Sequence, residues 1–213
     1  MLLASATAPA REIGPAAAAA GAPVAPSVLV AGLGRPAPAR TAFAEARFLH
    51  MLDRPLVVSG QLAWLGGDRL ERRVERPRAE VATIAGGEVT QQRPGKPPRH
   101  FSLARAPQLQ VLLDSFVALL SGDAGRLQRA FAIQASGDAA GAWTMTLVPR
   151  DPTVARTVAS IVIDGHARES RCMQVREADG DVAVDLLGAL AADMPALPTP
   201  EALRALCQGA PGA

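Results

Sequence analysis

Apolar and polar residues alternate along the segment from Pro55 to Glu80, and this alternation predicts the two strands of a hairpin. The first strand ends at Trp64, Gly66-Gly67-Asp68 forms the turn, and the second strand ends at Arg76. Because successive side chains of a strand point to opposite faces of a sheet, the hairpin has one apolar face and one charged face. The apolar face consists of Leu56, Val58, Leu62, Trp64, Leu70 and Val74.

Strand patterns also precede and follow this hairpin. The segment from Thr41 to Met51 combines residues that favour a helix with an alternation that favours a strand, and we interpret it as a strand because it leads directly into the hairpin. Asp179-Gly180 is a common turn between two strands. Further strands are predicted at 79–84, 88–91, 100–103, 131–135, 142–148, 158–164, 171–177 and 182–187. Short turns between consecutive strands predict an antiparallel meander.

The period of the apolar positions changes from two to that of a helix after Pro107. The residues that recur at helical spacing are Leu109, Leu112, Leu113, Phe116, Val117 and Leu120. Shorter helices are predicted after Asp123, after Asp151-Pro152 and after Thr199-Pro200, because these residues are typical of helix starts. One more short helix fits residues 27–33.

These elements predict a mainly β protein, α+β by content. Helices at 107–131, 152–158 and 199–207 are the elements available to cover the apolar face of the sheet. We expect three parts: a flexible Ala/Pro-rich segment at 1–40, a sheet domain at 41–190, and a linker with a short helix at 191–213. Residues 1–40 lack a basic region followed by a continuous apolar core, so they make a poor secretory signal and are either a tail or the remnant of a signal region.

Composition and charge exclude several classes of function. Hydrophobic residues make up 49% of the chain but aromatic residues only 3%, so we expect an interior of Leu, Val, Ala and Met. The formal net charge is +2 and the charges are dispersed, which argues against nucleic-acid binding. No run of 18 apolar residues occurs, so no membrane-spanning helix is predicted.

Candidate catalytic and metal-binding residues are few. None of the three histidines has the spacing of a metal site, and we find no nucleotide-binding or nucleophile motif. Asp164-Gly165-His166 offers an acid and a base, but a turn is the favoured interpretation of Asp-Gly at the end of a strand. Glu177, Asp179 and Asp181 surround a hairpin turn that is too short to supply the six or more oxygens that calcium needs. We therefore expect no enzymatic activity and no cofactor.

The two cysteines, Cys172 and Cys207, match neither a zinc nor a redox spacing. Two buried thiols are the favoured interpretation, and a disulfide is the alternative if the compartment is oxidising.

Several short motifs, taken in order, resemble the outer-membrane lipoprotein carrier proteins of the LolA type, specifically a divergent LolA-related group. They are Phe43-x-Glu45-x-Arg47, Pro55-Leu56, Ser59-Gly60-Gln61-Leu62, Asp68-Arg69-Leu70-Glu71, Arg76-Pro77-Arg78-Ala79-Glu80, the turn at Gly86, Trp143-x-Met145-x-Leu147-x-Pro149-Arg150-Asp151 and Glu177-Ala178-Asp179-Gly180-Asp181. The resemblance covers residues 41–187. It implies an incomplete, strongly curved antiparallel β-barrel whose concave face is covered by short helices, and it implies the periplasm of a Gram-negative bacterium.

The function that this resemblance implies is that of a non-enzymatic carrier or chaperone for the acyl chains of a lipid or lipoprotein. It also implies membrane-bound donor and acceptor proteins, and we expect a monomer. The expected cavity residues are Leu56, Val58, Leu62, Trp64, Leu70, Val74, Leu112, Phe116, Trp143, Met145 and Leu147. The pattern alone equally allows a solid core, and the alternative function is an envelope assembly module that binds a protein partner through its sheet face or edge.

One departure from the family pattern bears on mechanism. The well-studied carriers have an Arg-Pro dipeptide between the first two hairpin strands, and this arginine holds the helical lid shut. The matching positions here are Gly66 and Gly67. Arg72 has the parity of Leu70 and Val74, so it either points inward, as a substitute donor or a contact for an anionic headgroup, or extends to the strand edge.

Overall fold

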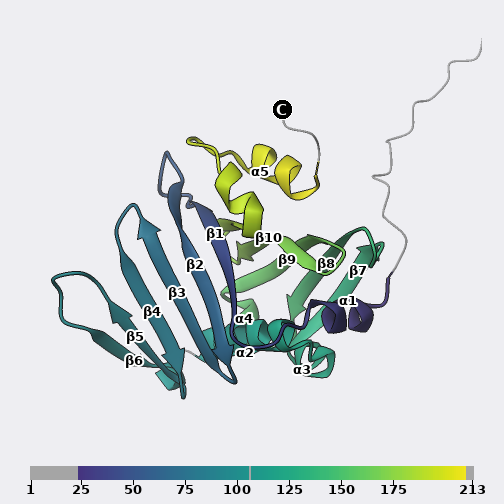
Figure 1. Ribbon diagram of the computed structural model, residues 1–213, viewed down its shortest axis with the longest axis horizontal. Coiled ribbons are helices and arrows are strands. Elements are labelled where there is room, and N and C mark those ends of the chain that lie inside the picture. Colours follow the sequence, from purple (N-terminus) through teal and green to yellow (C-terminus); the bar gives the residue numbers. More distant parts are fainter. Residues whose placement is uncertain (1–23, 106, 210–213) are drawn as a thin grey trace, which may run out of the picture.

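Eleven strands form one open antiparallel sheet in the computed structural model of the protein, which describes residues 24–105 and 107–209 but not the side chains of 107–109 and 112. The strand order is β6-β5-β4-β3-β2-β1-β11-β10-β9-β8-β7. Strands that follow each other in sequence lie side by side (Figure 1), except that β6 and β7 form the two edges of the sheet. In the middle of the sheet, β1 pairs with β11. The strands are β1 (Ala39–Phe48), β2 (Leu56–Gly66), β3 (Arg69–Arg76), β4 (Glu80–Ala85), β5 (Glu88–Gln92), β6 (Arg99–Ser102), β7 (Phe131–Gly137), β8 (Ala142–Pro149), β9 (Val158–His166), β10 (Glu169–Glu177) and β11 (Val182–Leu187).

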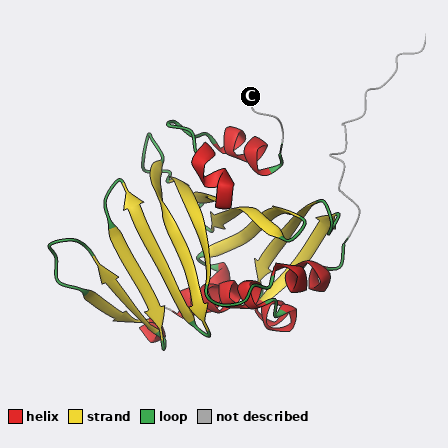
Figure 2. Cartoon of the chain, viewed as in Figure 1, coloured by secondary structure: helices red, strands yellow, loops and turns green. Residues whose placement is uncertain are grey.

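Within the described ranges, five α-helices and two short 3₁₀ helices accompany the sheet; the helices are drawn in red in Figure 2. They are α1 (Pro26–Leu33), η1 (Leu103–Arg105), α2 (Pro107–Ser121), α3 (Ala124–Ala130), α4 (Pro152–Ala155), η2 (Gly188–Asp193) and α5 (Pro200–Cys207). Three of them begin at the predicted caps, because the side chains of Asp123, Asp151 and Thr199 each accept a hydrogen bond from a backbone N–H of the first turn. The predicted fold class, a curved and incomplete antiparallel barrel with short helices, is confirmed.

The inner face of the sheet is the face on which α1 to α4 pack, and its core lies over β7 to β10. Leu29 of α1, Leu119 of α2 and Leu127 of α3 belong to the same cluster of buried side chains as Met145 and Ile163. In Figure 1 these helices lie together below the strands of this half of the sheet. The long insertion between β6 and β7 thus covers one half of the inner face.

The outer face carries η2 and α5, which is a correction to the expectation that residues 199–207 cover the same face as the other helices. Leu190 and Leu203 pack with Val184 and Leu186 of β11. Leu186 pairs in register with Cys172, whose neighbour Met173 packs against the inner cluster. Because successive residues of a strand alternate between faces, α5 lies on the side opposite to α2.

A disulfide joins Cys172 of β10 to Cys207 of α5. The favoured interpretation of two free thiols was therefore wrong, and the alternative holds. The spacing of 35 residues gave no indication of the bond, because only the fold brings the last helix against β10.

The Asp164-Gly165 dipeptide was also interpreted incorrectly as a turn. Both residues lie within β9, and the chain turns after His166. Gly165 is needed there because a Cβ atom at this position would overlap the indole ring of Trp143.

The first predicted part of the chain is described only from residue 24 onward. Its described portion includes α1, whose Leu29, Val30 and Leu33 are buried in the inner core. The division at residue 40 otherwise stays a prediction. None of the helices within the described ranges is long and apolar enough to cross a membrane.

Candidate functional site

The inner face has a packed half and an open half. Over β7 to β10 the side chains are enclosed by helices, whereas Leu62, Leu70 and Ile84 on β2 to β4 are only partly buried. Strand pairing places these three on one face. Leu62 lies opposite Arg72, which shares a face of β3 with Leu70, and Leu70 lies opposite Ile84. Among the described residues, the two clusters of packed apolar side chains do not include Leu62, Leu70 or Ile84. We call these three residues the apolar wall.

The predicted cavity residues are divided between the two halves. Trp143, Met145 and Leu147 are at most 3% exposed and form part of the helix-covered core, against which Phe116 also packs. Those on β2 and β3 share the inner face, as the hairpin pattern predicted. Of that set Trp64 and Val74 are buried, Val58, Leu62 and Leu70 are partly buried, and Leu56 is 48% exposed at the end of the strand. The side chain of Leu112 lies outside the described residues.

Two open pockets lie near opposite ends of β4 and β5. One, of about 450 Å³, lies between the Gly86-Gly87 turn, Leu103 and Val111 of α2. The other, of about 560 Å³, lies beside Val74, Glu80 and the loop at 93–96. Both volumes fall within the range of small-molecule pockets, about 300–1,000 Å³. Of the predicted cavity residues whose side chains the structure describes, only Val74 lines either of them.

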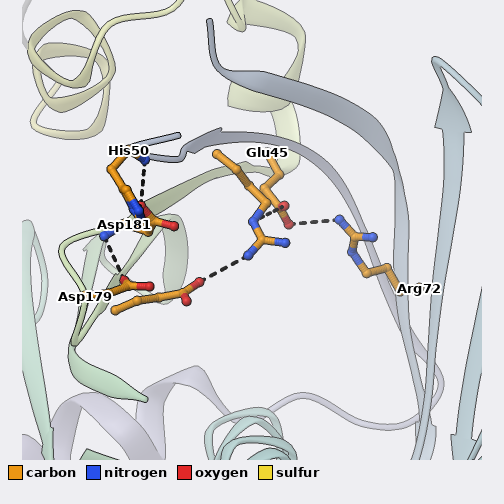
Figure 3. Close-up of polar contacts among 7 residues, drawn as sticks. Glu45, His50, Arg72, Asp179 and Asp181 are labelled. Carbon is orange, nitrogen blue, oxygen red and sulfur yellow. Dashed lines mark hydrogen bonds and ion pairs between the residues drawn. The ribbon is translucent and has the colours of Figure 1, made fainter. Parts of the chain in front are cut away.

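Charged side chains cross the middle of the inner face (Figure 3). Arg72 of β3 donates a hydrogen bond from Nη2 to Glu45 Oε2 at 2.9 Å, and Arg47 of β1 donates from Nη2 to Glu177 Oε1 at 3.1 Å. Arg47 Nε also lies 3.9 Å from Glu45 Oε1. Together with Asp185 of β11, which is directly opposite Glu45 in the sheet, these residues form what we call the inner polar cluster.

Arg72 reaches across β2 because that strand presents a glycine at the crossing. Gly60 pairs in register with Phe43 on one side and Val74 on the other, so no side chain of β2 stands between them. The guanidinium carbon of Arg72 lies 4.6 Å from the centre of the Phe43 ring, a distance at which a cation and an aromatic face attract each other. Arg72 thus points toward the inner face and does not extend to the strand edge. Its partner is a carboxylate on β1, not a helix.

Asp185 is the most perturbed member of the inner polar cluster. The residue is only 6% exposed, and among the described residues its carboxyl group has no hydrogen-bond partner. Burial first, and then the charge of Glu45, raise the pKa of Asp185 to about 8, although Arg72 and Arg47 act in the opposite direction. At neutral pH this carboxyl group is therefore mostly protonated.

The two glycines at the position of the family latch form the turn between β2 and β3. Both have a left-handed backbone, with φ of 100° at Gly66 and 59° at Gly67, which glycine adopts without steric cost. The indole Nε1 of Trp64 donates a hydrogen bond to the Gly67 carbonyl oxygen at 3.0 Å. The turn is thus anchored to the inner face by a tryptophan.

A second polar group lies at the end of β1, around His50. The backbone N and the Nδ1 of His50 both lie 2.8 Å from Asp181 Oδ1, and the side chain of Asp179 accepts a hydrogen bond from the Asp181 backbone at 3.1 Å. The side-chain hydrogen bond to Asp181 raises the pKa of His50, and the backbone hydrogen bond from His50 lowers the pKa of Asp181. One ligand atom from each of these three residues lies within 4.8 Å of the others, so they could hold a cation together. The sequence pattern pointed to the two aspartates but not to His50.

The other candidate acid and base do not form a site. Thr144 donates a hydrogen bond to Asp164 Oδ1 at 2.6 Å. Both residues lie on the outer face, because their neighbours Met145 and Ile163 belong to the inner core. His166 is exposed at the end of β9. The structure therefore does not bring these two side chains into a common pocket.

Sequence reasoning missed Glu45, Arg47, Glu177 and Asp185 as a functional group. Two signals were present: the spacing of Glu45 and Arg47 by two, which places both on one face of a strand, and a single acidic residue in the otherwise apolar β11. What joins them is the pairing of β1 with β11, which are far apart in the chain.

The described residues thus form an open, curved antiparallel sheet whose inner face is partly covered by helices. The model of a protein family described as outer membrane lipoprotein carrier protein LolA-like matches residues 17–210. The chain belongs to this family, and the resemblance that the sequence motifs indicated is confirmed.

Among solved structures, the chain is similar to a LolA superfamily protein from Nitrosomonas europaea. The two are 11% identical, with a TM-score of 0.40, and the similarity covers 79% of this chain and 94% of that one. No protein with a curated description matches the sequence.

Proposed function

We propose that the protein is a non-enzymatic carrier or chaperone of the periplasm that binds acyl chains of a lipid or lipoprotein on the inner face of its sheet. The observation that supports this most is the apolar wall: Leu62, Leu70 and Ile84 are only partly buried on the inner face and, among the described residues, belong to neither packed cluster. Membership in the lipoprotein carrier family is the second support.

Apolar burial is sufficient for such binding. Each methylene group removed from water contributes about 0.8 kcal/mol, so a chain of several methylenes is held without any catalytic or metal centre. The ligand would contact the apolar wall together with Val58, and the packed Trp143, Met145 and Leu147 would support the sheet from the other half. Release would follow when the helical insertion shifts, and membrane-bound donor and acceptor proteins are the expected partners.

The disulfide supports the proposed location. Bonds of this kind persist in oxidising compartments such as the periplasm and are rare in the reducing cytosol. Cys172 and Cys207 are joined, and both are buried. A periplasmic protein of this family would therefore form this bond.

The test is extraction of the protein purified from a Gram-negative periplasm, followed by lipid mass spectrometry. We expect co-purified acyl lipid in the wild-type protein and less in Ile84→Asn, which places an amide on the apolar wall. Val162→Asn is the matched control, because Val162 is also partly buried but lies on the outer face of β9. Absence of lipid from the wild-type protein, together with no binding of a fluorescent fatty acid, would rule out the proposal.

One observation favours the alternative, an assembly module with a protein partner. The edge strand β6 is exposed over three of its four residues, and its Phe101 is 42% exposed. An unpaired strand edge is a template for a strand of another protein. Wild-type protein free of lipid, combined with a partner whose binding is lost in Phe101→Lys, would support this alternative.

A further inference from the structure

The inner polar cluster has one more carboxyl group than it has arginines. It contains two arginines and three carboxyl groups, and each arginine is engaged: Arg72 with Glu45 at 2.9 Å, and Arg47 with Glu177 at 3.1 Å. Asp185 is more than nine-tenths buried and, among the described residues, neither forms an ion pair nor accepts a hydrogen bond. If all three carboxyl groups ionise, one negative charge is left without a counter-charge in a poorly solvated place, which is costly.

Asp185 lies on the inner face, next to the strands that lead to the apolar wall. The residue keeps 6% of its surface exposed. The side chain points to the inner face, since it pairs in register with Glu45 and Met173, and Met173 packs against the inner core. Glu45 in turn pairs with Val58 of β2. The acidic pair therefore lies beside the strand that carries Leu62 of the apolar wall.

We propose that Asp185 and Glu45 bind the ammonium group of an amphiphile whose chain lies on the apolar wall. This inference rests on the proposed function and specifies the chemistry of the ligand. A single positive charge would complete the cluster, and the charged group would bind where the apolar surface ends. An anionic headgroup fits less well, because both arginines are already paired with carboxylates.

Binding of an ammonium group should release a proton. Burial raises the pKa of Asp185 to about 8, so the free protein holds a proton there at pH 7, whereas an adjacent cation favours the carboxylate. The charged groups that face Asp185 are Glu45 and Arg47 on β1 and Arg72 on β3, and β10 contributes the apolar Met173. Glu45 is already paired with Arg72, which leaves Asp185 as the source of the proton.

The experiment is isothermal titration calorimetry of the full chain with decylammonium, decanol and decanoate, which share an alkyl chain and differ in charge. Decylammonium stays charged well above pH 9, because alkylammonium groups resemble the lysine side chain, with a pKa of about 10.4. Titrations in two buffers of different ionisation enthalpy give the number of protons released. We expect nearly one proton to be released at pH 7 and almost none at pH 9. The affinity for decylammonium relative to decanol should rise about tenfold from pH 7 to pH 9, since one pKa unit corresponds to a factor of ten.

Two variants complete the test. Asp185→Asn should abolish the proton release and the preference for decylammonium while leaving decanol binding unchanged. Glu71→Gln is the matched control, because Glu71 is a carboxylate on the outer face of β3 whose only ion pair is with Arg73 among the described residues. The proton count of the wild-type protein does not depend on either variant, so it decides the matter even if Asp185→Asn fails to fold.

The outcomes separate this inference from the proposed function. Failure of decanol to bind would overturn both. If decanol and decylammonium bind with equal affinity and no proton is released, the ammonium site alone is overturned. Tighter binding of decanoate than of decylammonium would have the same consequence.

The ammonium group has two sources, an aminolipid headgroup and the free amino terminus of an acylated peptide. Lysophosphatidylethanolamine and an S-decyl-cysteinyl peptide, each compared with its N-acetylated form, distinguish them. The source is the probe that loses affinity at least tenfold on acetylation, and equal binding of both pairs would contradict the inference.

Discussion

Asp185 is the residue whose ionisation should dominate the pH dependence of stability near neutral pH. Burial raises its pKa from the ordinary 3.8 to about 8, so between these values the folded protein keeps a proton that the unfolded chain has lost. The free energy of unfolding should therefore fall as the pH rises through this window, by at most about 1.4 kcal/mol per pH unit from this group. Above pH 8 the contribution becomes constant.

Urea denaturation at pH 5 and pH 8 measures this effect. Asp185→Asn should lose the dependence, so its stability relative to the wild-type protein should increase between the two pH values. Glu71→Gln, on the outer face, should keep the wild-type dependence. An Asp185→Asn variant whose stability changes with pH as the wild type does would contradict the assignment.

Arg72 and Glu45 should be energetically coupled. Their side chains are 35% and 15% exposed and meet at 2.9 Å, so the pair is less screened than a surface ion pair. A double-mutant cycle with Arg72→Met and Glu45→Gln should give a coupling energy of about 1 kcal/mol. The neighbouring pair Arg73 and Glu71 joins at 3.0 Å with 52% and 27% exposure and should give less than about half of that. Equal couplings for the two pairs would indicate that the inner polar cluster has no special environment.

At the residue scale, the face to which each side chain of the hairpin points could be predicted from the sequence. The partners of those side chains on other strands could not. Alternation correctly placed Arg72 on the face of Leu70 and Val74, because neighbouring positions of a strand must alternate. The ion pair with Glu45 could not be predicted, since it depends on Gly60 lying between Phe43 and Val74.

At the scale of elements, α5 is held to the outer face by one covalent bond and a small apolar contact. The bond spans 35 residues, and Leu203 packs against β11. For a loop of this size the chain-entropy model predicts a stabilisation of about 3–4 kcal/mol. Reduction should therefore lower the free energy of unfolding by this amount.

Chemical denaturation with and without dithiothreitol tests the contribution of the disulfide. Cys207→Ser serves as the control, because it should have the stability of the reduced wild type and should not respond to the reductant. A wild-type protein equally stable in both conditions would show that packing of Leu203 and Leu190 alone holds η2 and α5.

Every predicted strand and helix within the described ranges is present, with ends displaced by a few residues. The alternation and the capping residues are local signals, and local signals decide where elements begin and end. The side of the sheet on which a helix packs is not local. The sequence of α5 is amphipathic like that of α2, and only the pairing of β1 with β11 creates the outer surface that it covers.

At the scale of the whole molecule, the chain folds so that its first and last strands meet at the centre of the sheet (Figure 1). The helical insertion lies between the two edge strands, β6 and β7, and packs on the half formed by β7 to β10. The apolar wall on β2 to β4 remains partly exposed, with the inner polar cluster between the wall and the core. This asymmetry is the basis of the proposed carrier function.

The measurement that tests this claim most directly is paramagnetic broadening of methyl signals by a fatty acid that carries a nitroxide near the end of its chain. The protein would be methyl-labelled at Leu and Ile. Signals of Leu62, Leu70 and Ile84 should broaden, because the chain lies against the apolar wall, while those of Leu203 in α5, on the outer face, should stay sharp. Broadening confined to the outer face, or no broadening with the fatty acid in excess, would contradict the account.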